Sequence, residues 1–246
     1  MSSASSRLMW VAAFVFVGSL SVLAADGTEN AKGSPTSAPD GGKKVAVDQS
    51  SAKATLETMA RAFKARDGSA ITACLPPEYQ ETMGRMLVAV MDMLAKSDSL
   101  KKAVEAKFGK EAAATALKGS PADTMSNGGP FGEDGVIDWT KVKLTEEGDT
   151  ATVVEDGKSS KETIKKINGK WYMSPPDGMT VERAKQESEQ GVKMMKALGS
   201  AMVDVEKQVN DGKIEKDNLQ KALGEAIMKV MGEAMKDATP PGGAPN

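Results

Sequence analysis

Three short motifs in this chain place reactive residue types at spacings that catalytic sites use. Residues 50–53 and 99–102 both read Ser-x-x-Lys, the spacing of nucleophile and lysine in serine acyl enzymes. Residues 157–159 read Gly-Lys-Ser, which is how a phosphate-binding loop ends. Each motif lacks its second half: no Lys-Thr-Gly element accompanies the serines, and Thr152 stands where the loop's first glycine belongs. We therefore interpret all three as surface composition.

The composition removes most other catalytic and metal-binding chemistry. Histidine is absent, which excludes Ser-His-Asp and Cys-His catalysis and every zinc site that uses histidine. Cys74 is the only cysteine, so thiolate clusters and a disulfide framework are excluded too. We expect Cys74 to be a small buried core residue, with a reactive or intermolecular thiol as the alternative. The glycine-rich residues 127–135 have too few oxygen ligands for calcium, and we predict no metal and no cofactor.

The first 24 residues have the three-part layout of a secretory signal peptide. Residues 1–7 are polar with one positive charge, residues 8–20 are apolar, and cleavage is predicted after Ala24. The apolar stretch is shorter than the ~20 residues of a membrane span, so an uncleaved anchor is the less favoured alternative. We expect a secreted or periplasmic protein with no transmembrane span after cleavage.

Charge and composition mark out the folded part of the chain. The formal net charge is -2, which gives no electrostatic footprint for nucleic acid. Residues 25–49 and 239–246 contain almost nothing apolar to bury, so we predict a disordered linker and a disordered tail. Between them we predict an α+β domain at 50–176 and a helical hairpin at 177–238.

Helical periodicity dominates the first part of the predicted domain. The expected segments are a helix capped at Ser50 or Ser51 and ended by Asp67-Gly68, a short piece at 70–75, a longer helix beginning at Pro77 with an apolar stripe to Leu94, and shorter pieces at 100–108 and 110–117. After the glycine-rich stretch at 119–135 the period changes to that of strands.

Four strands are predicted, at 136–144, 150–155, 160–167 and 170–174. Asp156-Gly157 and Asn168-Gly169 are typical two-residue hairpin turns, so the strands should form an antiparallel meander.

Two long helices are predicted after Pro175-Pro176. Thr180 caps the first, and Asp211-Gly212 turns the chain into the second. Six methionines lie in this hairpin: Met194, Met195, Met202, Met228, Met231 and Met235. Core packing is their expected role, with an adaptable binding surface as the alternative. The hairpin could cover the sheet, pack on the N-terminal helices, or form a dimer seam.

An amphipathic helix at 55–63 runs into Ala-Arg-Asp-Gly-Ser-Ala at 65–70, and Gly-Asp-Thr-Ala-Thr-Val at 148–153 precedes Asn-Gly-Lys-Trp-Tyr at 168–172. Together these stretches resemble the nuclear-transport-factor-two-like (SnoaL-like) superfamily, especially its exported bacterial members. The resemblance covers residues 51–176. It implies a cone in which helices pack inside a strongly curved antiparallel sheet, with a ligand pocket at the mouth.

The resemblance also implies candidate acid–base residues, because catalytic members place Asp, His or Tyr in the cone. Asp138, Tyr79 and Tyr172 are the possible substitutes here. Burial could tune Asp138 as a general base, although a solvated strand end is the simpler interpretation. Trp139 and Trp171 are expected as core aromatics, with pocket walls as the alternative.

The leading hypothesis is therefore an exported, non-catalytic α+β protein with a four-stranded curved meander and a C-terminal helical hairpin. It would bind a small apolar ligand or a protein partner in the cell envelope, through residues that the sequence does not identify. The second hypothesis is a structural protein that forms a homodimer through the Met-rich hairpin. The third is a cone-fold enzyme with a carboxylate base.

Overall fold

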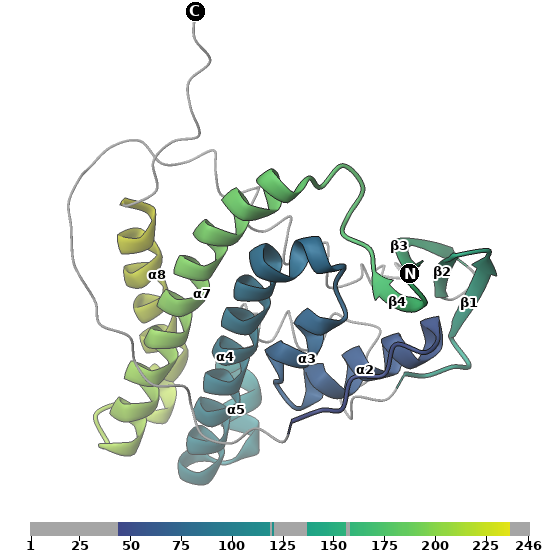
Figure 1. Ribbon diagram of the computed structural model, residues 1–246. Coiled ribbons are helices and arrows are strands. Elements are labelled where there is room, and N and C mark those ends of the chain that lie inside the picture. Colours follow the sequence, from purple (N-terminus) through teal and green to yellow (C-terminus); the bar gives the residue numbers. More distant parts are fainter. Residues whose placement is uncertain (1–43, 119, 121–136, 156–157, 237–246) are drawn as a thin grey trace, which may run out of the picture.

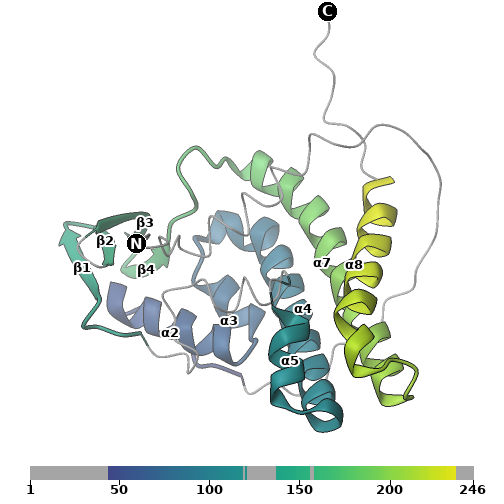
Figure 2. The same cartoon turned by 180° about the vertical axis from the view of Figure 1, so that it is seen from behind.

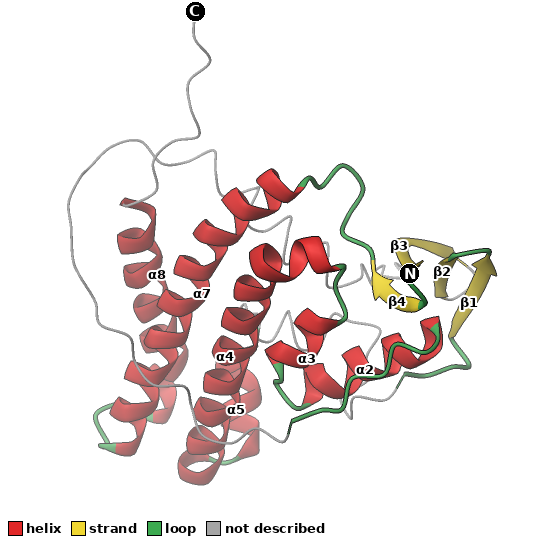
Figure 3. Cartoon of the chain, in the orientation of Figure 1, coloured by secondary structure: helices red, strands yellow, loops and turns green. Residues whose placement is uncertain are grey.

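The computed structural model describes residues 44–118, 120, 137–155 and 158–236. The expected signal peptide at 1–24, most of the linker at 25–49 and the tail at 239–246 lie outside the described residues. Helices flank a four-stranded sheet, so the α+β class is confirmed (Figure 3). The sheet and α2 lie at one end of the molecule, and the two C-terminal helices lie at the other (Figures 1 and 2).

Four helices precede the sheet: α2 (Ala52–Lys64), α3 (Gly68–Ala73), α4 (Pro77–Phe108) and α5 (Lys110–Leu117). The Ser51 hydroxyl accepts from Ala54 N at 3.0 Å and begins α2, as its position predicts. α4 is one helix of 32 residues, so the predicted interruption before residue 100 is wrong. Residues 96–99 contain neither glycine nor proline, and Lys96 donates to Asp92 one turn earlier at 2.7 Å, so nothing ends the helix there.

The sheet is an antiparallel meander in the order β1 (Val142–Glu147), β2 (Thr150–Glu155), β3 (Lys158–Ile167) and β4 (Lys170–Met173), which confirms the predicted topology. Asn168 and Gly169 have φ angles of 51° and 81°, as a primed hairpin turn requires. The first strand begins at Val142 rather than at residue 136, which corrects the prediction. A turn precedes it, because Val142 N donates to Asp138 O at 3.0 Å.

The C-terminal hairpin consists of α7 (Val181–Asn210), a 3-10 turn (Lys216–Asn218) and α8 (Leu219–Lys236). α7 packs along α4, and α8 packs on α7 and on α5 (Figures 1 and 2). Ser99 Oγ donates to Glu206 Oε1 at 2.9 Å and so joins α4 to α7. Of the three dockings that the sequence left open, packing on the N-terminal helices is therefore the one formed.

The methionines of the hairpin divide into two groups. Met194, Met195 and Met202 are buried together with Leu198, so core packing is confirmed for them and this row does not form a dimer seam. Met231 is partly buried, the side chain of Met235 lies outside the described residues, and Met228 is 73% exposed.

The last residues of the expected linker lie against the domain. Val45 N donates to Asp67 Oδ2 at 2.9 Å, and Gln49 Nε2 donates to Ala73 O at 3.1 Å. Trp171 N donates to Gln49 O at 3.0 Å, and Gln49 Nε2 donates back to Trp171 O at 2.9 Å. Because β4 is an edge strand, Gln49 satisfies backbone groups that the meander leaves unpaired. Residues 45–49 of the predicted linker therefore belong to the folded domain.

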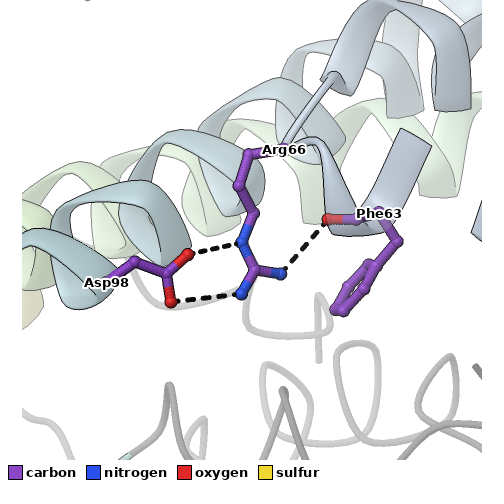
Figure 4. A network of polar contacts seen from close by, with 3 residues as sticks. All are labelled: Phe63, Arg66 and Asp98. Atoms are coloured by element: carbon purple, nitrogen blue, oxygen red, sulfur yellow. Dashed lines mark hydrogen bonds and ion pairs between the residues drawn. The ribbon is translucent and has the colours of Figure 1, made fainter. Parts of the chain in front are cut away.

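A polar clamp joins the turn between α2 and α3 to the middle of α4 (Figure 4). Arg66 has a φ of 57°, in the left-handed region, which points its side chain across to Asp98. Its Nε donates to Asp98 Oδ2 at 2.9 Å and one Nη to Asp98 Oδ1 at 3.3 Å, while the other Nη donates to Phe63 O at 3.2 Å. The guanidinium also lies 5.0 Å from the centre of the Phe63 ring.

We expect the clamp to contribute about 1 kcal/mol to the free energy of unfolding, because the pair is bidentate but the Asp98 side chain is 45% exposed. A double-mutant cycle with Arg66→Ala and Asp98→Ala, followed by urea unfolding, measures this coupling energy. The coupling energy between Arg66 and Asp98 should decrease in high salt. A coupling of zero would show that the Phe63 contacts alone hold Arg66.

Candidate functional site

Asp138 caps a turn, and its side chain is 48% exposed. Its carboxylate accepts from Thr140 N at 3.1 Å and forms an ion pair with Lys141 at 3.0 Å. The Thr140 hydroxyl and then Lys141 lower the pKa of Asp138 to about 2. A carboxylate with this pKa is a poor proton acceptor near neutrality, so the general-base interpretation loses its best candidate.

The two candidate tyrosines lie in different parts of the fold. Tyr79 Oη donates to Met179 O at 2.8 Å, which holds the connection after β4 onto the beginning of α4. Tyr172 is 8% exposed in β4, at the opposite edge of the sheet from β1, which Asp138 precedes. The three residues suggested by the resemblance thus come from three separate places.

The two tryptophans support the sheet. Trp171 is buried, which confirms its place in the core. Trp139 is partly buried, its Nε1 donates to Glu57 Oε1 at 3.2 Å, and Lys53 Nζ lies 5.1 Å from the centre of its ring. Both contacts of Trp139 join the residues before β1 to α2.

Cys74 is completely buried, so its predicted role as a small core residue is confirmed. Burial raises the pKa of its thiol from 9.0 to about 12, because the thiolate would lose its hydration.

We expect a disulfide reagent to leave Cys74 unmodified at pH 8 in the native protein and to react only on unfolding. The unfolded thiol ionises near pH 9.0 and the folded thiol near pH 12, so its stabilising effect is complete below pH 9.0 and declines as the pH rises between these values. Thiol release followed against a urea gradient checks the first point, and Cys74→Ala should flatten the alkaline decline. Modification without denaturant would contradict the burial.

A groove lies between α4 and α7. It encloses about 410 Å³ and is lined by Glu81, Thr82 and Arg85 from α4 and by Lys185, Ser188, Glu189, Val192 and Lys193 from α7. The helices approach closely beside it, because a Cβ on Gly191 would lie 2.9 Å from Met86 Sδ. The charged lining residues are exposed and form the rim, while Ser188 is buried and forms the floor.

Ser188 is the chemically unusual member of the groove. It is 3% exposed, and its hydroxyl has no hydrogen-bond partner. A buried hydroxyl without a partner is uncommon, since its desolvation is not offset. A serine hydroxyl can donate one hydrogen bond and accept others. The Ser188 oxygen exposes less than 1 Å², so a molecule in the groove reaches it only if the side chain rotates toward the groove.

The rim carries both signs of charge. Arg85 is paired with Glu81 along α4 at 3.2 Å, whereas Lys185, Glu189 and Lys193 lie along α7 at helical spacing. The sequence presents Glu189 and Lys193 as an ordinary solvated pair and gives no sign that they border a groove. The signal that marks the place is the small pair Ser188 and Gly191 between charged residues on one helix face.

Replacing Ser188 by alanine is expected to stabilise the protein by about 1 kcal/mol, because a buried unsatisfied hydroxyl is removed. This raises the melting temperature by roughly 2–4 °C for a chain of this size. Ser174→Ala is the matched control, because its hydroxyl is also buried and unpartnered but does not line the groove. Calorimetry of both variants tests this, and destabilisation by Ser188→Ala alone would mean that its hydroxyl is satisfied within the fold.

Two kinds of feature, a metal-binding cluster and a membrane-spanning helix, are absent from the described residues. Within the described ranges, no three or more Asp, Glu or Cys side chains gather where they could hold a metal ion. None of the helices in that part of the chain combines the length and the apolar character that a membrane span requires. Comparisons of the chain with protein-family models, with curated proteins and with solved structures gave no match, so the resemblance to the nuclear-transport-factor-two-like superfamily stays a prediction.

Proposed function

We propose that this protein is a non-catalytic binding domain that acts after export and holds a charged segment of a protein partner in the α4–α7 groove. The observation that carries the proposal is the unpartnered Ser188 hydroxyl on the floor of the groove. A partner that draws this hydroxyl toward the groove by rotation of the Ser188 side chain, and then donates to it or accepts from it, would offset a desolvation cost that the free protein bears.

The chemistry of the rim favours a protein partner over a small apolar ligand. Lys185, Lys193 and Glu189 can steer and orient a segment that carries both signs of charge. A small apolar ligand would leave these groups without complementary partners. Binding without chemistry also agrees with Asp138, whose carboxylate is committed to a turn.

Export is the second part of the proposal and rests on the sequence of residues 1–24. Native mass spectrometry of protein purified from the exporting cell reports its N-terminus and any retained molecule together. A chain that begins after Ala24 is expected. An N-terminus still at Met1 would overturn the export, and a retained apolar molecule would favour the small-ligand alternative.

Site-specific photo-crosslinking tests the groove. A photoreactive residue in place of Glu189 on the rim should capture a discrete partner in the exporting cell. The same residue in place of Lys213, in the turn after α7 and outside the groove, is the positional control. Adding Lys185→Glu and Lys193→Glu should abolish the adduct at position 189, because the rim then loses both lysines and keeps only Arg85, which is paired with Glu81.

Ser188→Ala should weaken the adduct at position 189, whereas Ser174→Ala should leave it unchanged. The same adducts from positions 189 and 213, or an adduct that survives the rim charge reversals, would contradict the proposal. Circular dichroism of each variant verifies that the helices are intact.

A further inference from the structure

The outer face of α8 carries a row of residues that no contact among the described residues uses. Gly224, Met228 and Gly232 follow one another at four-residue intervals, so they share one face of the helix. Leu219 and Leu223 are buried on the inner face, where α7 and α5 lie. α8 lies at the outer edge of the molecule, in both views (Figures 1 and 2).

The row is apolar and exposed, and its two glycines lower the intrinsic stability of the helix. Met228 is 73% exposed, more than any other large hydrophobic residue noted on the described surface. No atom outside the helix backbone lies within 4 Å of where a Cβ on Gly224 or Gly232 would be. Two glycines within a helix destabilise it relative to alanine, and packing within the described ranges gives no reason for them. Glycine on a helix face does allow another helix to approach closely.

The charged residues beside this row are complementary to those of a second α8 helix when the two helices run antiparallel. Lys221, Glu225, Lys229 and Glu233 alternate in sign at four-residue intervals, and Lys221 pairs with Glu225 at 3.9 Å while both stay at least 70% exposed. In an antiparallel pair of α8 helices with a twofold axis at residue 227, Glu225 lies opposite Lys229 of the second copy. Lys221 then lies level with Glu233 of the second copy, so each pair is of opposite sign.

The same register brings the apolar row of one copy against the apolar row of the other. With the axis at residue 227, Met228 of one copy lies between Met228 and Gly224 of the other, so that each methionine packs over a glycine backbone. In a parallel pair in register, Glu225 and Lys229 of the two copies would instead lie on opposite sides of the interface, so the Glu225–Lys229 pairs between copies could not form.

We propose that the outer face of α8 binds a second copy of this chain, in an antiparallel helix pair centred on residue 227. The interface is isologous, as a twofold dimer requires, with Met228 at its centre and the Glu225–Lys229 pairs along its side. The pair lies on α8 and leaves the α4–α7 groove outside the interface. The dimer and the proposed partner site are therefore tested separately.

Sedimentation equilibrium of the purified chain is the first experiment. A reversible dimer is expected, and Met228→Glu should weaken it by at least about tenfold, because a charge replaces the central apolar contact. Val203→Glu is the matched control, since Val203 is also an exposed apolar helix residue, 43% exposed on α7. A monomer at every concentration, or equal weakening by both variants, would overturn the proposal.

Charge exchange tests the register. E225K makes both side positions of one chain positive, and K229E makes both negative, so each variant alone should fail to dimerise. Mixed in equal amounts, the two variants should form a heterodimer, and the double variant E225K/K229E should dimerise with itself. Circular dichroism checks that α8 stays helical. Wild-type affinity in either single variant would show that the dimer uses another face.

Cysteine pairing distinguishes the two orientations. An E225C chain mixed with a K229C chain should form a mixed disulfide under mild oxidation, because the antiparallel register places these positions opposite each other. Cys74 is buried and does not compete. Homodisulfides from E225C alone that form as fast as the mixed disulfide would overturn the antiparallel register.

Discussion

Replacing Met202 by aspartate is expected to unfold this protein rather than to separate a dimer. Met202 is completely buried on α7, among Leu198, Val205 and the other core residues. Truncating a buried methionine side chain to alanine costs about 2–5 kcal/mol by itself. Burying an unpaired carboxylate adds a cost of several kcal/mol. The sum is comparable to the whole stability of about 5–15 kcal/mol that is typical of a domain.

Val203→Asp is the matched control for this prediction. Val203 is the next residue of the same helix and is 43% exposed, so its replacement should change the free energy of unfolding by no more than about 0.5 kcal/mol. Far-ultraviolet circular dichroism and urea unfolding compare the two variants. Met202→Ala supplies a graded measurement, with an expected loss of about 2–5 kcal/mol. A folded, monomeric Met202→Asp protein would mean that α7 does not pack on α4 as described.

The second large effect is expected at Gly68, where α3 meets α4. A Cβ at this position would lie 2.7 Å from the Cα of Val88 and 3.2 Å from its backbone nitrogen. Backbone atoms of a long helix cannot rotate away, so Gly68→Ala forces α3 off α4. Overpacking of this kind typically costs about 1–3 kcal/mol, and the backbone clash places Gly68→Ala at the upper end.

Ser69→Ala is the matched control, because Ser69 is the exposed neighbour in the same short helix. It should leave the melting temperature almost unchanged, while Gly68→Ala lowers it by several degrees. Adding Val88→Ala should not rescue Gly68→Ala, because the nearest atom belongs to the backbone and not to the valine side chain. Rescue by Val88→Ala would show that the side chain alone limits the approach.

Local chemistry made several elements predictable from the sequence. Ser51 and Thr180 begin helices because their hydroxyls accept from backbone N–H groups three residues later. Asn168-Gly169 turns the chain because both residues adopt a positive φ. The meander follows from such short-range turns, since consecutive strands joined by hairpins become neighbours.

The predictions that the structure corrects concern segments whose conformation depends on contacts with distant parts of the chain as well as on local sequence. The sequence predicts a separate helical piece at 100–108 after an apolar stripe that ends at Leu94, but α4 is continuous because Leu100 and Val104 extend its buried face against the rest of the core. Gln49 looked like part of a linker by composition, yet it pairs with Trp171, which is 122 positions away. A single sequence has no signal for a hydrogen bond between two such distant residues.

The sequence by itself determined the kinds of elements in this protein, their order, the meander and the absence of histidine chemistry, because each depends on residue type and close spacing. Only the tertiary structure decided that α7 and α8 dock on the N-terminal helices, that Ser188 closes a groove, and that Met228 is left outside the core. These features depend on which faces of distant helices meet. Apolar periodicity shows that a helix has a face to bury, but the residues that cover the face lie elsewhere in the chain.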